Sequence, residues 1–304
     1  MATTLGFAGE RRMRKKPSKE NNEEDKKNSQ FPSPLAVLLP MRYTFRSIPT
    51  SATPEEGLQI FSIKVAQLKE EEGLRWPLHV YGLIAVRDSI DPRRNLLFCH
   101  TRDGCQTITE EDPFLLLTGP SRAIVIIDPV SFEVQLKAKG ESGSEDKVLV
   151  YDVLNSQHAV SHMGHPPPVN TSYLWGKCCN LGFAFAVLSR TVEATICVEV
   201  VEGSWPENIP GRITTCTASI PKTKILLLDS GSARVPVNDS GIIKLSRQVV
   251  SVELCGQLKV QVQAVYAGEH IKKNVYFTPK KATISWSLFS ESESESDSDP
   301  ADLL

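Results

Sequence analysis

The sequence lacks a long uninterrupted run of apolar residues. Leu35–Leu39 is the longest such run near the start, and a transmembrane helix needs about 20 residues. The polar N-terminus also lacks the pattern of a secretory signal peptide. We therefore expect no contact with a membrane and a location in the cytoplasm or nucleus, not secretion.

Paired cysteines and an excess of one charge are missing as well. The seven cysteines form no CxxC pair, and the formal net charge is -2. Near-balanced charge argues against a broad field for nucleic acid or an anionic membrane, so nucleic acid is not an expected ligand of the folded core. Thiols of an unsecreted chain stay reduced.

Familiar catalytic patterns are absent too. The chain has no GxSxG elbow, phosphate-binding loop, GxGxxG fingerprint or HExxH pair. Cys99 and His100 are neighbours and would face opposite sides of a strand, so they do not form a nucleophile and its base. We therefore assign no catalytic residue and expect no cofactor, and we favour a protein that is not an enzyme.

Helical periodicity is also missing, and a period of two takes its place. Apolar residues alternate with polar ones around Phe132–Ala138, Val192–Val200, Leu258–Ala264 and Ile284–Leu288. Such alternation is typical of antiparallel strands with one buried face. One helical turn is predicted at Lys69–Glu72. The predicted fold class is all-β.

Two parts of the chain resemble each other. SRAIVIIDPVSFEVQLKAKG, which begins at Ser121, aligns with SRQVVSVELCGQLKVQVQAVYAG, which begins at Ser246, and the segments before and after each also match in order. Three matches in the same order predict an internal repeat. Each unit would have about 90 to 100 residues, which suits a β-sandwich. We predict two related antiparallel β-sandwich-like halves packed together.

Composition places the boundaries of these units. The predicted parts are a disordered tail of mixed charge (1–30), a Pro- and Ser-rich lead-in (31–56), a first β unit (57–154), a Pro-rich linker (155–179), a second β unit (180–289) and an acidic disordered tail (290–304). The basic run Arg11–Lys16 could serve as a nuclear import signal or belong to a transit peptide; a solvated tail is the simpler interpretation.

Four residues are candidates for binding because they recur in both halves. Arg122 and Arg247 each follow a serine at matching places, and Trp76 and Trp205 each precede a proline beside a strand. The arginines could bind an anion twice, or they could pair with a carboxylate or cap loop carbonyls. The tryptophans could stack on sugars; packing against the core is the favoured interpretation.

Metal sites are weakly indicated. His158, His162 and His165 lie in the predicted linker before Cys178 and Cys179, but adjacent cysteines point in opposite directions and a Pro-rich loop is a poor preformed cage. Asp88, Asp91, Asp112 and Asp128 sit at predicted strand ends, without the spacing of a calcium loop. We therefore predict no metal site.

Specific strings resemble one known family. These are CQTI at Cys105, DPFLLLTGPSRAIV at Asp112 and DPVSFEVQLKAKG at Asp128, followed by ILLLDS at Ile225 and IKLSRQVVSVELCGQLKV at Ile243. They resemble a plant family, mainly of grasses, that is known only as a domain of unknown function. The resemblance covers roughly residues 58 to 288. It implies that some relatives are fused to ribosome-inactivating N-glycosidase domains, and it supplies no catalytic residues.

Three functional hypotheses follow. The preferred one is a non-catalytic binding or interaction module for a protein or carbohydrate ligand, with a link to stress or defence implied by the family. The second is an enzyme acting on RNA or sugars, which the fused relatives suggest and no motif supports. The third is a nucleic-acid-associated protein that uses the basic N-terminal tail.

Overall fold

Three antiparallel β-sheets make up the computed structural model. It describes residues 2–7, 53–156, 166–200, 204–206, 209–266 and 269–278. The only helices within these ranges are two short 3₁₀ turns, η1 (Glu70–Glu72) and η2 (Gly143–Glu145). The all-β prediction is confirmed, and so is the single turn near Lys69. In these ranges no helix is long and apolar enough to cross a membrane.

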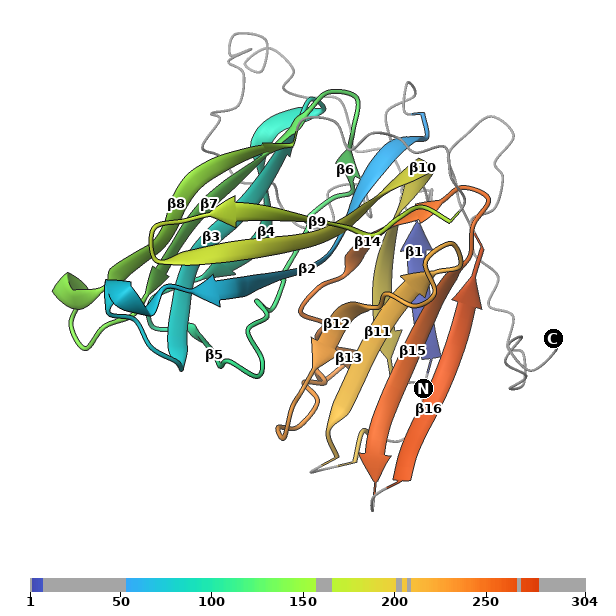
Figure 1. Cartoon of the computed structure of the whole chain (residues 1–304). Coiled ribbons are helices and arrows are strands. Elements are labelled where there is room, and N and C mark those ends of the chain that lie inside the picture. The colour runs from blue at the N-terminus through green and yellow to red at the C-terminus, as the bar shows by residue number, and fades with distance from the viewer. Residues whose placement is uncertain are drawn as a thin grey trace, which may run out of the picture.

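The largest sheet has seven strands and lies at the centre. Its strands are β1 (Ala2–Phe7), β2 (Glu55–Leu68), β6 (Ile124–Val125), β9 (Asn170–Trp175), β10 (Cys179–Glu199), β13 (Ile242–Ile243) and β14 (Val249–Glu253). The longest strand, β10, pairs with β2 and β9 along its first part and with β1, β13 and β14 along its second part. It therefore runs through both ends of the molecule (Figure 1).

Two smaller sheets pack against the central one. The five-stranded sheet contains β3 (Leu78–Asp88), β4 (Asp91–His100), β5 (Gln106–Ile108), β7 (Val130–Ala138) and β8 (Lys147–Ser156). The four-stranded sheet contains β11 (Gly211–Thr217), β12 (Ile225–Asp229), β15 (Leu258–Tyr266) and β16 (Glu269–Phe277). The order β4-β3-β7-β8 in one matches β12-β11-β15-β16 in the other. This common order supports the internal repeat, which remains a prediction.

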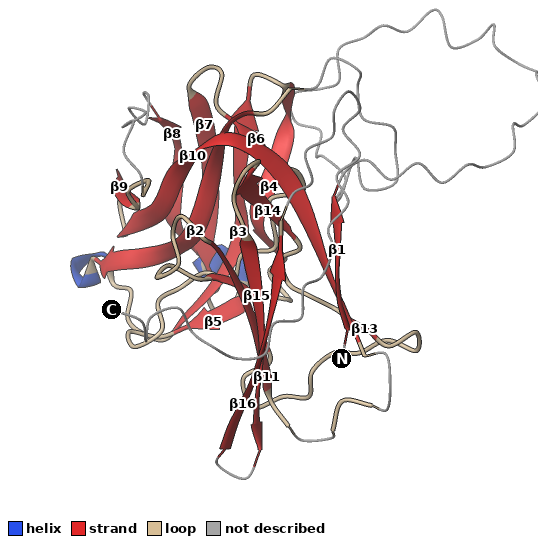
Figure 2. Ribbon diagram, turned by 90° about the vertical axis from the view of Figure 1, so that its right-hand side faces the viewer, coloured by secondary structure: helices blue, strands red, loops and turns tan. Residues whose placement is uncertain are grey.

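Alternation along β10 places the two smaller sheets on opposite faces of the central sheet. Phe183 and Phe185 belong to the core shared with the five-stranded sheet, whereas Ala186 and Leu188 belong to the core shared with the four-stranded sheet. Successive side chains of a strand point to opposite faces. Each end of the central sheet therefore forms a two-layer sandwich on a different side (Figures 1 and 2).

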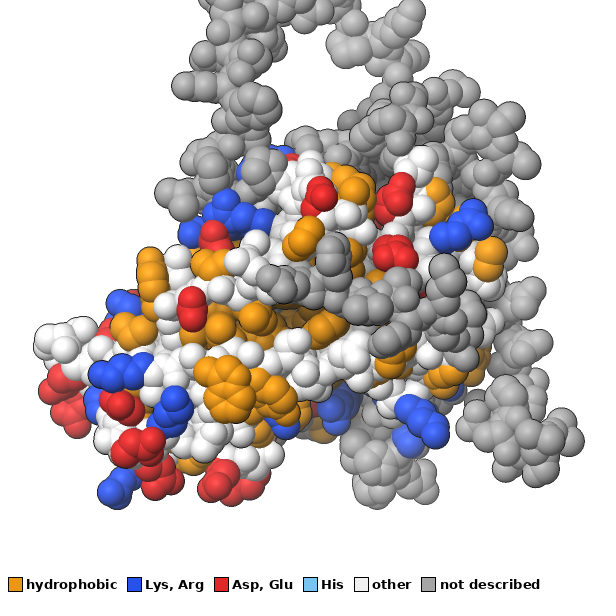
Figure 3. All heavy atoms as spheres, turned by 45° about the horizontal axis from the view of Figure 1, so that its top comes forward, with side chains coloured by type: hydrophobic (Ala, Val, Ile, Leu, Met, Phe, Trp, Pro, Cys, Tyr) orange, Lys and Arg blue, Asp and Glu red, His pale blue; other side chains and the backbone are white. Residues whose placement is uncertain are grey.

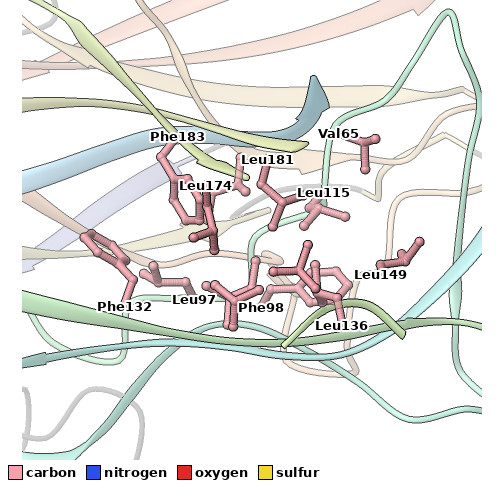
Figure 4. Packing of buried hydrophobic residues seen from close by; sticks show 14 of the residues in the cluster. Val65, Leu97, Phe98, Leu115, Phe132, Leu136, Leu149, Leu174, Leu181 and Phe183 are labelled. Carbon is pink, nitrogen blue, oxygen red and sulfur yellow. The ribbon is translucent and has the colours of Figure 1, made fainter. Parts of the chain in front are cut away.

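The alternating patterns in the sequence correspond to these cores. Along β7, the residues Val130, Phe132, Val134, Leu136 and Ala138 are buried, and those between them are partly or fully exposed. In the first core, Leu174 and Phe183 face Phe132 and Leu97 across the interior (Figure 4). Burial of this kind contributes about 25 cal/mol for each Å² of apolar surface removed from water.

Two predicted boundaries differ from the structure. The predicted disordered tail includes strand β1, and the predicted linker includes strand β9, whose Leu174 is buried in the first core. Both segments are strands because β10 is long enough to pair with them as well as with β2 and β14. The rest of 1–30, the acidic tail and the strand predicted at 284–288 lie outside the described residues.

Candidate binding surface

Arg122 lies in the interior, where it forms an ion pair with Asp88. Its Nη1 donates to Asp88 Oδ2 over 2.7 Å and its Nη2 donates to Asp88 Oδ1. The two side chains are only 4% and 1% exposed. The Asp88 carboxylate also accepts the Val125 N–H at 3.0 Å, so the pair fixes strand β6 to the end of β3.

A second polar side chain holds the same turn. Asn95 accepts the Ser121 N–H at 2.7 Å and donates to the Arg122 carbonyl at 2.9 Å. Glu193 of β10 accepts the Ala123 N–H at 2.7 Å. Burial raises the pKa of Glu193, while that hydrogen bond and the charge of Arg122 oppose the rise. The first Ser-Arg position is thus part of a buried network that joins the central and five-stranded sheets.

Arg247 occupies the matching place in the second half, with different partners. It is 1% exposed, and its Nη1 donates to the Ile60 carbonyl at 2.7 Å. Within the described residues no carboxylate pairs with it, and its Nη2 has no hydrogen-bond partner. Burial lowers the pKa of Arg247 to about 9. Both arginines thus lie in the interior, where one pairs with a carboxylate and the other caps a carbonyl.

The two candidate tryptophans also pack inward. Trp205 is 4% exposed, and its indole N–H donates to the Ile209 carbonyl at 2.8 Å. Trp76 is partly buried against the first core. The Trp205 ring is therefore closed to a sugar, whereas the Trp76 ring is covered by the core only in part.

The metal candidates do not come together in the described part of the chain. His158, His162 and His165 lie outside it. Cys178 and Cys179 are buried, and burial raises the pKa of Cys179 to about 12. No group of three or more His, Cys, Asp or Glu residues suited to a metal ion occurs among the residues described.

A different surface carries exposed aromatic side chains. On strand β9, Leu174 points into the first core, so Tyr173 and Trp175 point to the opposite face of the central sheet. Tyr173 is 47% exposed and Trp175 is 69% exposed. Their ring centroids lie 6.1 Å apart. Among the described residues, no second layer covers this face here, because the four-stranded sheet covers it only at the other end of β10.

The strands next to β9 complete this surface. Trp175 is the register partner of Asn180 on β10, which in turn pairs with Gln67 on β2. Tyr173 pairs with Gly182, which has no side chain to fill the space beside the ring. We call these five residues, Gln67, Tyr173, Trp175, Asn180 and Gly182, the aromatic face.

Asn180 has an unsatisfied group within the aromatic face. Its side chain is an amide with one acceptor and one donor end, and the residue is 2% exposed. Nδ2 donates to Gln67 Oε1 at 2.8 Å, while Oδ1 is buried without a partner among the described residues. A buried acceptor without a donor costs free energy. The aromatic face therefore contains an acceptor that a ligand could satisfy.

Charges around the aromatic face are mixed and mostly engaged. Lys64 Nζ lies 5.7 Å from the centroid of the exposed Phe114 ring, and Lys69 Nζ donates to the Gly176 carbonyl at 2.7 Å. Lys177 lies 3.5 Å from a carboxylate oxygen of Glu72. Figure 3 shows hydrophobic side chains on the left and in the centre of one side of the molecule, with Lys, Arg, Asp and Glu side chains interspersed among them. This surface has no dominant charge.

The sequence contains a signal for this surface, which the linker prediction overlooked. In NTSYLW, Tyr173 and Trp175 flank a single apolar residue with period two, which places two aromatic rings on the polar side of a strand. Asn180 and Gln67 carry no such signal, because only the pairing of β2, β10 and β9 brings them together.

The fold and this surface define a class, a β-sandwich protein with two cores built on one shared central sheet. Residues 57–291 match the model of the family described as Domain of unknown function (DUF6598). Because the match covers more than half of the chain, the protein belongs to this family. No curated protein and no solved structure matches the chain.

Proposed function

We propose that this protein is a non-catalytic binding module and that its ligand contacts the aromatic face. The observation that carries the proposal is the exposure of Trp175: 69% of the residue is accessible, on a sheet face that no other described strand covers. Large aromatic side chains dominate the energetics of binding surfaces, because they bury much area at little cost in conformational entropy.

The arrangement of titratable groups supports a non-catalytic role. Asp88 is engaged by Arg122, and Asp146 accepts bonds from both Arg102 and Tyr81. Each of these interactions fixes a turn or loop. A catalytic site would bring an acid or base with a shifted pKa next to an accessible nucleophile or cleft.

We propose that the module acts in the cytoplasm or nucleus. The strings that resemble a plant family with fused N-glycosidase domains support a role in stress or defence. In that setting the chain would supply binding, and the fused domain of a relative would supply catalysis.

Affinity capture with paired variants tests the proposed surface. The full chain and the double variant Y173A/W175A are immobilised and exposed to an extract of the tissue that expresses the protein. Tyr151→Ala is the matched control, because Tyr151 is an equally accessible aromatic residue, 74% exposed, on strand β8 of another sheet. We expect the original chain and Y151A to retain the same molecules and the double variant to lose them.

Retention of every captured molecule by a folded Y173A/W175A variant would exclude the aromatic face as the binding surface. Loss of the captured molecules with the Y151A variant alone would place the binding surface on β8 instead. Circular dichroism and the melting temperature establish that each variant is folded before capture.

A further inference from the structure

We propose that the aromatic face binds a neutral carbohydrate chain through ring stacking and the amide of Asn180. This inference rests on the proposed function, because it names the ligand of the same surface. The side chains that carry it are Tyr173, Trp175, Asn180 and Gln67.

The rings of Tyr173 and Trp175 suit the apolar C–H face of a sugar. A pyranose ring has a face of C–H groups that is apolar, and hydroxyl groups around its edge. Tyr173 and Trp175 present apolar ring faces together with a hydroxyl and an indole N–H, so each can contact C–H groups and donate a hydrogen bond at its rim. Residues two apart on one strand lie along its direction, so a ligand that contacts both runs along β9.

The Asn180 amide suits the hydroxyl groups at the edge of a sugar. Its Oδ1 is buried without a partner, and its Nδ2 is already bonded to Gln67. A sugar hydroxyl can donate to Oδ1 and at the same time accept from the Gln67 amide, whose Oε1 is already used. Trp175 is the register partner of Asn180 and is largely exposed. The proposal requires that side chains around Asn180 move aside when the sugar hydroxyl binds, because Oδ1 is buried in the free protein.

Shape and charge favour a neutral chain. Gly182 leaves the floor beside Tyr173 shallow, and β9 is an edge strand, so the surface is open along its length. An open surface suits an extended chain better than a single small molecule. The neighbouring cations Lys64, Lys69 and Lys177 already contact the Phe114 ring, the Gly176 carbonyl and Glu72 respectively, which disfavours a polyanion.

A peptide fits the aromatic face less well. Protein partners bind through anchors that fill well-packed pockets surrounded by contacts that exclude water. The positions beside the Tyr173 ring are occupied by Gly182, Ala66 and the aliphatic stem of Lys64, which form a flat floor. A flat floor with a hydrogen-bond acceptor offers stacking and polar contacts without a pocket for an apolar side chain.

Affinity gel electrophoresis with soluble neutral polysaccharides tests the proposal. The full chain is run in native gels that contain a β-glucan, a xylan, a mannan or a galactan, beside W175A, W175F, N180A and the control Y151A. We expect at least one polysaccharide to retard the full chain and Y151A equally. The W175A variant should bind about tenfold more weakly or worse. The W175F variant should lose less affinity because it keeps an aromatic ring. The N180A variant should also bind more weakly, although Trp175 can still stack on the sugar.

Fluorescence gives a second measurement on the same samples. Binding should shift the emission of the exposed Trp175 to shorter wavelength, and this shift should be absent in W175F. Equal retardation of the folded W175A variant would overturn the proposal, as would the absence of retardation by all four polysaccharides. If captured proteins still depend on Tyr173 and Trp175 in that case, only the ligand class is wrong; if no capture depends on them, the proposed function falls as well.

Discussion

Arg122 and Asp88 form an ion pair in the interior of the first sandwich, whereas Arg247, at the matching place in the second half, has no carboxylate partner among the described residues. The two Ser-Arg positions are therefore alike in sequence and burial but different in electrostatics. In the first half the carboxylate compensates the buried charge. In the second half the Ile60 carbonyl is the principal partner.

This difference predicts unequal costs for the same substitution. Arg122→Met leaves Asp88 charged and buried without its partner, and we expect the free energy of unfolding to fall by about 3 to 5 kcal/mol. Arg247→Met removes a buried cation whose desolvation costs free energy and is not offset by any described carboxylate. We therefore expect the free energy of unfolding to fall by no more than about 1 to 2 kcal/mol. Urea unfolding of both variants measures the difference, and equal losses would contradict it.

The surroundings of Asp146 predict that the stability of the fold depends on pH. Hydrogen bonds from Arg102, Tyr81 and the Gly140 N–H hold the pKa of Asp146 far below its ordinary value of 3.8. A carboxyl group whose pKa is lower in the folded state stabilises the fold above its unfolded pKa, and this contribution is lost as the pH falls.

We therefore expect Asp146→Asn to lower the urea midpoint at neutral pH and to have a shrinking effect below about pH 4. Tyr81→Phe removes one of the three donors and should show a smaller loss of the same form. A difference between D146N and the original chain that is unchanged from neutral pH to pH 2 would refute this role of the carboxylate.

Position 82, in the middle of β3, has no room for a side chain larger than that of glycine. Its φ is 119°, and a Cβ added there would lie 2.0 Å from the Gln135 carbonyl oxygen on β7. We expect Gly82→Ala to destabilise the fold by about 3 kcal/mol, because both the conformation and the space exclude a side chain. Gly143→Ala is the control, since no atom lies within 4 Å of its added Cβ. Thermal unfolding of the two variants should differ clearly.

Cysteine reactivity should follow burial. Cys99 and Cys255 are exposed, whereas Cys179 is buried and its pKa is raised to about 12. Because the thiolate is the species that reacts with alkylating reagents, we expect Cys99 and Cys255 to be labelled in the native protein and Cys179 only in denaturant. Mass spectrometry of labelled peptides distinguishes the sites, and rapid native labelling of Cys179 would show that the first core opens.

Much of the fold could be predicted from local pattern. The alternation of Val130 to Ala138 gives the strand β7 and its buried face directly, because the period of a strand is two. The boundaries between the predicted units were harder to derive from the sequence. Strand β9 falls within the predicted linker because that segment contains Pro166, Pro167 and Pro168 and shows little alternation, and because its pairing partner lies on β10.

The candidate site was harder to predict than the strands. Recurrence singled out Arg122, Arg247, Trp76 and Trp205, and recurrence at matching places is also what repeated packing produces. Trp205 illustrates this, since its indole N–H bonds to a backbone carbonyl in the core. The exposed Trp175 does not recur, so the same criterion passed over it.

The sequence by itself determined that the chain forms antiparallel strands with buried alternate residues, because side-chain period is a local property of the backbone. Only the tertiary structure decided which face of each strand remains uncovered. Opposite faces of β10 serve the two cores, so at the β9 end the described residues cover only one face of the central sheet. There Gln67, Trp175 and Asn180, which are distant or unremarkable in sequence, become neighbours because strand pairing joins residues by register and not by their order in the chain.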